Sequence, residues 1–291
     1  MEVPLLKTLA FQSIRRFCWF SLCLAMAGQA RAELVVVRPG LGHTRTAVFR
    51  FHDRDGTLIN TLSADTEGFC GLTAGPEGNL YVAGNTLGYG DVYRFSPGGV
   101  LQGSFASENL TVPTALEFGP DGDLYVAGLA YLTDTEGGRV LRYNGADGTF
   151  EDTFIPTGLG GLTNPVAVVF SPAGFLLVAD RHQGVLRYDA ASGAFLDVFI
   201  PTQPGVLDTV TGLTIGPDGN IYVSSGANNS VLRFAGATGA FLDEFVSPGS
   251  GGLAYPSGLT FGPDGRLYVC SRDSHAVLRY EGGTGAFRDA F

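Results

Sequence analysis

One short segment recurs five times along the chain and restricts the folds that the chain can adopt. The prolines of the five copies stand at positions 76, 120, 172, 217 and 263, with spacings of 44, 52, 45 and 46 residues. Each copy consists of an apolar stretch, a turn of the G-P-D-G type and a second apolar stretch, as in residues 118–128 (FGPDGDLYVAG). Proline presets such a turn, aspartate bonds to nearby backbone and glycine accepts a positive φ, so each copy predicts a β-hairpin.

A second motif, V-x-R followed by an aromatic residue, predicts two more strands after each hairpin. It occurs six times, at residues 48–51, 92–95, 140–143, 185–188, 231–234 and 277–280. A turn and a further strand-like stretch follow it, for example residues 194–199 (AFLDVF). Four antiparallel strands in a period of about 45 residues are typical of one blade of a β-propeller. The 43 glycines of the chain exclude the long helices that a helical solenoid of this period needs.

The repeats therefore predict an all-β, six-bladed β-propeller. Its blades are expected at residues 33–65, 66–110, 111–156, 157–202, 203–248 and 249–291. If the strands of a blade are called a to d from the propeller axis outward, blade 1 has candidates for b, c and d but not for a. We expect three strands in blade 1; the alternatives are that residues 27–33 supply strand a, or that the chain is a shortened version of a longer array.

The first 32 residues have the pattern of a secretory signal peptide. Lys7, Arg15 and Arg16 precede an apolar run at residues 17–27, and residues 30–32 (ARA) form a small-x-small cleavage site. We expect cleavage after Ala32, a secreted or periplasmic location, and a single propeller domain at residues 33–291. The apolar run is too short to span a membrane, which takes about 20 residues.

The charge of the chain restricts its partners. The formal net charge is −10, and the leader carries four of the 18 basic residues but one of the 28 acidic ones, so the remainder is more acidic still. Such a surface repels nucleic acid and anionic lipid. We expect a monomer that binds an extracellular protein, a glycan or a small molecule, and neither nucleic acid nor a membrane.

The repeat unit P-x-G-L-x-[FI]-G-P-D-G-x-L-Y-V-x-[SG], followed by V-L-R-[FY], resembles that of NHL-type repeat propellers. It is similar to the repeats of secreted streptogramin-lyase-like and gluconolactonase-like propellers, and the resemblance covers residues 33–291. Related repeats serve as lyases, as lactonases and as binding scaffolds. The resemblance therefore implies the fold and leaves the function open.

The residues that recur in every blade are expected to be structural. The arginines of the V-x-R motifs face aspartates on strand d in the later blades, so we expect cross-strand ion pairs rather than a ring that binds anions. These residues are Arg50, Arg94, Arg142, Arg187, Arg233 and Arg279, with Asp152, Asp197, Asp243 and Asp289. The aspartates of the G-P-D-G turns are expected to form turns rather than to bind calcium.

Residues outside the repeat are the candidates for function, and most lie in the loops between strands b and c. These loops share one face of a propeller with the loops that lead from d to the next a. The candidate ligand-binding residues are His43, Arg45, Arg181, His182, Asn229, Arg272 and His275. Our main hypothesis is a binding scaffold without catalysis or cofactor, which recognises a protein, glycan or small-molecule ligand on this face.

The alternative hypothesis is an enzyme with a His/Asp site at the mouth of the channel. His43, His182 and His275 share the loop face and could hold a divalent metal, and the pairs Asp180–His182 and Asp273–His275 could provide acid–base chemistry. The resemblance implies a metal-dependent lyase or a lactonase-like hydrolase in that case. The segment L-W-F-T-E that is typical of the lyases is replaced here by L-Y-V-A-G, which lacks the glutamate.

Two further positions stand out from the repeat. Glu117 takes the place that Thr73, Val169, Thr214 and Thr260 hold in the other inner strands, and an inward carboxylate is unfavourable unless it is paired. It is a further candidate catalytic residue, in support of a lactonase. Cys70 and Cys270, the two cysteines outside the leader, could form a disulfide if blade 1 lacks strand a, although two separate thiols are the simpler alternative.

Overall fold

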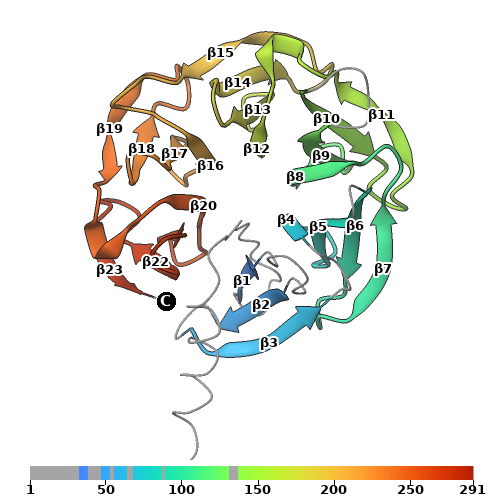
Figure 1. Cartoon of the computed structure of the whole chain (residues 1–291), viewed down its shortest axis with the longest axis horizontal. Coiled ribbons are helices and arrows are strands. Elements are labelled where there is room, and N and C mark those ends of the chain that lie inside the picture. Colours follow the sequence, from blue (N-terminus) through green and yellow to red (C-terminus); the bar gives the residue numbers. More distant parts are fainter. Residues whose placement is uncertain are drawn as a thin grey trace, which may run out of the picture.

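The computed structural model describes residues 33–38, 47–52, 56–63, 68–86, 89–130 and 137–290 of the chain. Six small antiparallel sheets are arranged in a ring around a central axis (Figure 1). The first sheet has three strands and each of the other five has four. The predicted six-bladed β-propeller is therefore confirmed, and so is the three-stranded blade 1. No helix in these segments is long and apolar enough to cross a membrane.

The strands follow one another along the chain from the axis outward in each blade. Blade 1 contains β1 (Glu33–Arg38), β2 (Ala47–His52) and β3 (Leu58–Ser63), and blade 2 contains β4 (Gly68–Ala74), β5 (Leu80–Thr86), β6 (Tyr89–Phe95) and β7 (Leu101–Ala106). Blade 3 contains β8 (Val112–Phe118), β9 (Leu124–Leu129), β10 (Gly138–Tyr143) and β11 (Phe150–Ile155). Blade 4 contains β12 (Pro165–Ser171), β13 (Phe175–Asp180), β14 (Gly184–Asp189) and β15 (Phe195–Pro201).

The last two blades repeat this order. Blade 5 contains β16 (Val210–Ile215), β17 (Ile221–Ser225), β18 (Ser230–Phe234) and β19 (Phe241–Val246), and blade 6 contains β20 (Pro256–Phe261), β21 (Leu267–Ser271), β22 (Ala276–Tyr280) and β23 (Phe287–Ala290). Two short 3-10 helices, η1 (Leu159–Gly161) and η2 (Ser250–Gly252), lie in the loops that lead into blades 4 and 6. In blades 2 to 6, strand a is β4, β8, β12, β16 and β20, respectively. The described part of blade 1 begins with strand b.

Aromatic side chains of successive blades interlock to form the core. The ring of Tyr125 on β9 packs edge-on against Phe154 of its own blade and Phe170 of blade 4, with centroid distances of 4.9 and 4.8 Å. Tyr222 on β17 repeats this arrangement with Phe245 and Phe261. Such edge-to-face pairs add to the hydrophobic stabilisation of each joint between blades. The repeated L-Y-V segment therefore holds neighbouring blades together.

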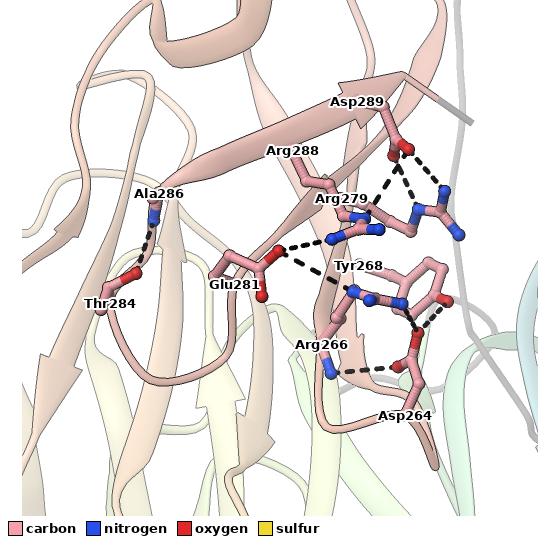
Figure 2. A network of polar contacts seen from close by, with 9 residues as sticks. All are labelled: Asp264, Arg266, Tyr268, Arg279, Glu281, Thr284, Ala286, Arg288 and Asp289. Atoms are coloured by element: carbon pink, nitrogen blue, oxygen red, sulfur yellow. Dashed lines mark hydrogen bonds and ion pairs between the residues drawn. The ribbon is translucent and has the colours of Figure 1, made fainter.

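The recurring arginines and aspartates form ion pairs within the blades, as the sequence predicts. In blade 6, Arg279 donates to both oxygens of Asp289 at 2.7 and 2.6 Å (Figure 2). Beside this pair, the Tyr268 hydroxyl donates to the turn residue Asp264 at 3.0 Å. Equivalent pairs form between Arg142 and Asp152, Arg187 and Asp197, and Arg233 and Asp243.

The turn aspartates have the structural role that was expected. Asp264 accepts a hydrogen bond from the backbone N–H of Arg266 at 3.0 Å, and Asp121 and Asp218 do the same in blades 3 and 5. Blade 4 departs from this scheme because Ala173 and Leu177 replace the turn aspartate and the tyrosine. There the guanidinium of Arg187 lies over the rings of Phe175 and Phe199 at 4.8 and 4.4 Å. The contact with Phe199 has equivalents in blades 3 and 5, where Arg142 and Arg233 lie over Phe154 and Phe245, so the contact with Phe175 is the one that is particular to blade 4.

The glycine at the corner before strand d locks each of the last four blades onto the blade before it. Gly148 has a φ of +78°, and a Cβ atom there would lie 1.8 Å from the carbonyl oxygen of Phe105 in blade 2. The corresponding glycines are Gly193, Gly239 and Gly285. Only a residue without a side chain fits both the backbone conformation and this contact.

Cys270, the last residue but one of β21, is a free, buried thiol, so the disulfide between Cys70 and Cys270 is absent. Its burial raises the pKa of the thiol well above its ordinary value. Such a buried thiol behaves as a small apolar residue rather than as a reactive group. The side chain of Cys70 lies outside the described residues.

Candidate functional site

The inner strands leave a cavity along the propeller axis. Each of β4, β8, β12, β16 and β20 pairs with strand b on one side only, so its other edge faces the axis (Figure 1). The cavity has a volume of about 330 Å³, and runs of consecutive residues line it, for example 166–169 and 211–215. Consecutive rather than alternate residues line a wall when the edge of a strand forms it. Unpaired backbone N–H and C=O groups are therefore part of this wall.

Glu117 belongs to a layer of five equivalent positions around this cavity. Thr73, Glu117, Val169, Thr214 and Thr260 each pair across the sheet with the tyrosine or leucine of the L-Y-V segment. All five residues line the cavity. The layer lies near the G-P-D-G turns, since Glu117 is the last residue but one of β8. One carboxyl group thus stands among three threonine hydroxyls and a valine.

The environment of Glu117 favours its protonated form. The side chain is half-buried, and burial raises the pKa of the carboxyl from 4.5 to about 7, while a hydrogen bond with the Thr73 hydroxyl lowers it by less. Because Thr73 is on β4 of blade 2, this bond joins two neighbouring blades. Near neutral pH the carboxyl of Glu117 can therefore both give and take a proton.

The raised pKa of Glu117 predicts a pH-dependent difference between the wild type and Glu117→Gln. Below pH 4.5 the carboxyl is protonated in both folded and unfolded chains, and between pH 4.5 and about 7 only the folded chain keeps the proton. Wild-type stability therefore falls as pH rises through this window, and the variant does not share this loss. We expect Glu117→Gln to gain about 3 kcal/mol relative to wild type between pH 4 and pH 8.

Urea denaturation at both pH values measures this difference. Glu244→Gln, which changes an exposed glutamate on β19, is the matched control and should give the same difference at both values. If Glu117→Gln also shows no pH-dependent gain, the carboxyl is solvated like any surface glutamate.

On the opposite face of the propeller, the last residue of strand b ties the two loops of each later blade together. The carboxylate of Asp180 is fully buried and accepts hydrogen bonds from four backbone N–H groups, those of Thr163, Asn164, His182 and Gln183, at 2.7, 2.6, 2.9 and 3.0 Å. Burial alone would raise the pKa of Asp180, but these bonds outweigh it and lower the pKa. Asp180 therefore holds the loop entering β12 against the b–c loop.

In blades 5 and 6, a serine at the end of strand b contacts the loop that enters strand a. The Ser225 hydroxyl accepts from the N–H of Asp208 at 3.0 Å and donates to its carbonyl at 2.8 Å. Ser271 makes the same pair of contacts with Ala254 at 2.9 and 3.2 Å. Asp180 is thus the structural equivalent of Ser271 and not of Asp273.

The two Asp-x-His pairs consequently occupy different positions in their blades. Asp180 pairs with Gly184 at the end of its strand, whereas Asp273 lies in the turn and forms an ion pair with Arg272 at 2.8 Å. His182 is exposed, and its backbone rather than its ring contacts Asp180. His275 is half-buried with a φ of +57°.

The described part of the chain does not contain the cluster of metal-binding side chains that the metal hypothesis requires. Within these segments no group of three or more His, Cys, Asp or Glu side chains is placed to hold a metal ion. His43 and Arg45, which complete the sequence-based sets, lie outside the described residues. The described candidates Asp180, His182, Asp273 and His275 thus do not form a single set of metal ligands.

The loop face does bring together two of the predicted arginines around a tyrosine. The guanidinium carbon of Arg272 lies 3.4 Å from the ring centroid of Tyr255, and Nη1 of Arg181 lies 3.4 Å from its hydroxyl oxygen. Gly226, in the b–c loop of blade 5, leaves room for the ring, because a Cβ there would lie 3.1 Å from Cζ of Tyr255. Loops of blades 4, 5 and 6 therefore meet in this cluster of Arg181, Tyr255 and Arg272.

Tyr255 is held in an unusual conformation in this cluster. Its φ is +50°, a region that a bulky residue rarely adopts, and its N–H donates to Oδ1 of Asn229 at 2.6 Å. The predicted candidate Asn229 thus positions the tyrosine. Sequence reasoning missed Tyr255 itself, although an aromatic residue stands where Asn164 and Thr209 precede the other inner strands.

The fold of this chain is similar to that of several solved structures. No protein-family model matches the sequence, and no curated protein matches it. Among solved structures, a chain of a nidogen/laminin complex has a TM-score of 0.69 at 17% identity, with 89% of this chain and 92% of that chain covered. A putative gluconolactonase has a TM-score of 0.66 at 24% identity, with 89% and 87% covered.

A third similar structure is that of an enzyme of another class. Virginiamycin B lyase from Staphylococcus aureus has a TM-score of 0.63 at 14% identity, with 93% of this chain and 84% of that chain covered. Proteins described as a partner in a complex, a lactonase and a lyase are thus all similar to this chain. At these identities the likeness shows the six-bladed propeller fold, of the kind found in both binding proteins and enzymes.

Proposed function

We propose that this propeller is a binding scaffold whose loop face docks a protein partner through an acidic side chain. The observation that carries the proposal is the cluster of Arg181, Tyr255 and Arg272. Tyrosine and arginine are the residues most enriched where protein interfaces bind tightly, since both offer a large contact area and directed hydrogen bonds. The half-buried ring and guanidinium groups lose little side-chain freedom when a partner binds.

The charge of the cluster supports an acidic contact. Asp273 offsets the charge of Arg272, but within the described residues no carboxylate forms an ion pair with Arg181. A guanidinium can bind a carboxylate with two parallel hydrogen bonds. The similar structure of the nidogen/laminin complex supports a protein as the partner, since that propeller is part of a protein–protein complex.

Arg181→Gln is expected to weaken the binding of a carboxylate peptide while the fold stays intact. The probe is acetyl-tetraglutamate amide, titrated into the isotope-labelled protein and followed by NMR shifts of the arginine Nε–H groups. Loss of one charge-assisted hydrogen bond should reduce affinity by about 10-fold or more. Gly226→Ala, which pushes the ring of Tyr255 aside, should weaken binding as well.

Arg266→Gln is the matched control for this experiment. Arg266 lies on the G-P-D-G turn of blade 6, away from the loop face, where it pairs with Asp264 at 2.7 Å (Figure 2). This variant should bind the peptide like the wild type. Equal binding by Arg181→Gln would contradict the proposed site, and tighter binding of glucuronate than of the peptide would contradict a protein partner in favour of a glycan.

A further inference from the structure

We infer that the axial cavity is a binding site for a small organic ammonium ion, with the carboxylate of Glu117 as its counterion. The site lies at the end of the channel next to the G-P-D-G turns, away from the loop face to which the proposed docking function belongs. Thr73, Thr214 and Thr260 provide hydroxyl groups in the same layer. The two sites share no residue, so one can exist without the other.

No cation among the described residues of the cavity wall neutralises Glu117. Among the described residues that line the cavity, Glu117 is the one ionisable side chain. Its contact is the neutral hydroxyl of Thr73, which stabilises a carboxylate but does not neutralise it. Removing a carboxylate from water without a counterion is unfavourable, and a bound cation offsets this penalty. The cavity therefore favours a positively charged ligand over a neutral one of the same shape.

The walls of the cavity can hold an ammonium group. Such a group has three N–H donors and no acceptor, so it needs oxygen atoms around it. The threonine hydroxyls and the carbonyl groups on the free edges of the inner strands are oxygen acceptors that converge on the axis. One carboxylate oxygen and two neutral oxygens are enough for the three donors.

The cavity suits an organic ion better than a metal ion. Calcium takes six to eight oxygen ligands and usually several carboxylates, and magnesium needs a near-ideal octahedral site. Among the described lining residues a single carboxylate is available, and no group of three or more described His, Cys, Asp or Glu side chains is placed to hold a metal ion. The volume of about 330 Å³ is at the lower end of small-molecule pockets. Val166, Val169 and Leu213 on the wall provide apolar contacts for a short carbon chain.

Binding at this site is coupled to the release of a proton. Glu117 is partly protonated near neutral pH because burial raises its pKa to about 7. When the ammonium ion enters, the carboxylic acid loses its proton to solvent and the resulting carboxylate pairs with the ligand. Affinity should therefore rise with pH up to about 7 and level off above it, by linkage.

The test is calorimetric titration of the purified protein with n-butylammonium chloride. We expect binding at pH 8, about tenfold weaker binding for each pH unit below 6, and at pH 6.5 an apparent enthalpy that differs between phosphate and HEPES buffers because a proton is released. n-Butanol, the neutral analogue, and calcium chloride should bind at least about tenfold more weakly. No binding of butylammonium, or equal binding of butanol, would overturn the inference, and so would calcium binding in its place.

Two variants and one spectroscopic measurement complete the test. Glu117→Gln should lose at least about tenfold in affinity for butylammonium at pH 8, whereas Glu244→Gln, on the outer strand β19, should bind as the wild type does. Equal affinity of Glu117→Gln and wild type would overturn the inference. In the wild type, carbon-13 NMR of the Glu117 carboxyl should show its pKa fall when butylammonium is saturating. An unchanged titration would overturn it without any variant.

Discussion

Replacing Gly148 with alanine is expected to destabilise the propeller by about 3 kcal/mol. The φ of +78° places an alanine in the left-handed region, which costs about 1 kcal/mol. The new Cβ would also lie 1.8 Å from the carbonyl oxygen of Phe105, so blades 2 and 3 must move apart, and such overpacking typically costs a further 1–3 kcal/mol. Urea denaturation of the purified variant measures the loss.

Gly122→Ala separates the two contributions in the same blade. Gly122 has a φ of +90°, and nothing lies within 4 Å of the position of its Cβ. It should therefore lose only the conformational part, about 1 kcal/mol. If both variants lost the same stability, the corner glycine would contribute through its backbone conformation alone and not through the contact between blades.

Replacing Asp180 with alanine is expected to cost about 3 kcal/mol at pH 7. The substitution leaves the N–H groups of Thr163, Asn164, His182 and Gln183 without their acceptor in a buried place, and a lost hydrogen bond to a charged group costs about 1.5–3 kcal/mol. The folded carboxyl has a lowered pKa, so its contribution is present above pH 4 and is lost as pH falls through the folded value.

The loss should therefore be large at pH 7 and smaller at pH 3, as measured by denaturation at the two values. Asp180→Ser should recover part of it, because Ser225 and Ser271 hold the same loops in blades 5 and 6. Asp273→Ala is the control, since the Asp273 carboxylate is exposed and its ion pair with Arg272 should contribute less than about 1 kcal/mol. A loss at Asp273 equal to that at Asp180 would argue against the structural role of Asp180.

Periodic features of this fold could be predicted from the sequence because they recur with a fixed spacing. The ion pair between Arg279 and Asp289 follows from the constant length of the hairpin that joins strands c and d. The compensation in blade 4 could not be foreseen in this way. There Phe175 stacks on Arg187 in place of the missing tyrosine, and this depends on packing and not on spacing.

The candidate sites were only partly predictable for a related reason. Glu117 was visible as a departure from the repeat within one strand, and the structure places it among the threonines of the other strands. The meeting of Arg181, Tyr255 and Arg272 involves departures in different blades, which no single alignment of repeats brings together. The pairs Asp180–His182 and Asp273–His275 look alike in sequence, yet the blade 4 turn is one residue shorter, so they differ in register.

The free edges of the inner strands have a consequence for the behaviour of the protein in solution. An unpaired strand edge on a surface is a template for aggregation, because another chain can add to it as a new strand. In the ring these edges face a central space of about 330 Å³ and are flanked on all described sides by the neighbouring inner strands rather than lying on the outer surface. The same geometry still admits a small molecule. The position of the inner strands around the axis thus keeps their free edges off the outer surface, where strand addition would begin.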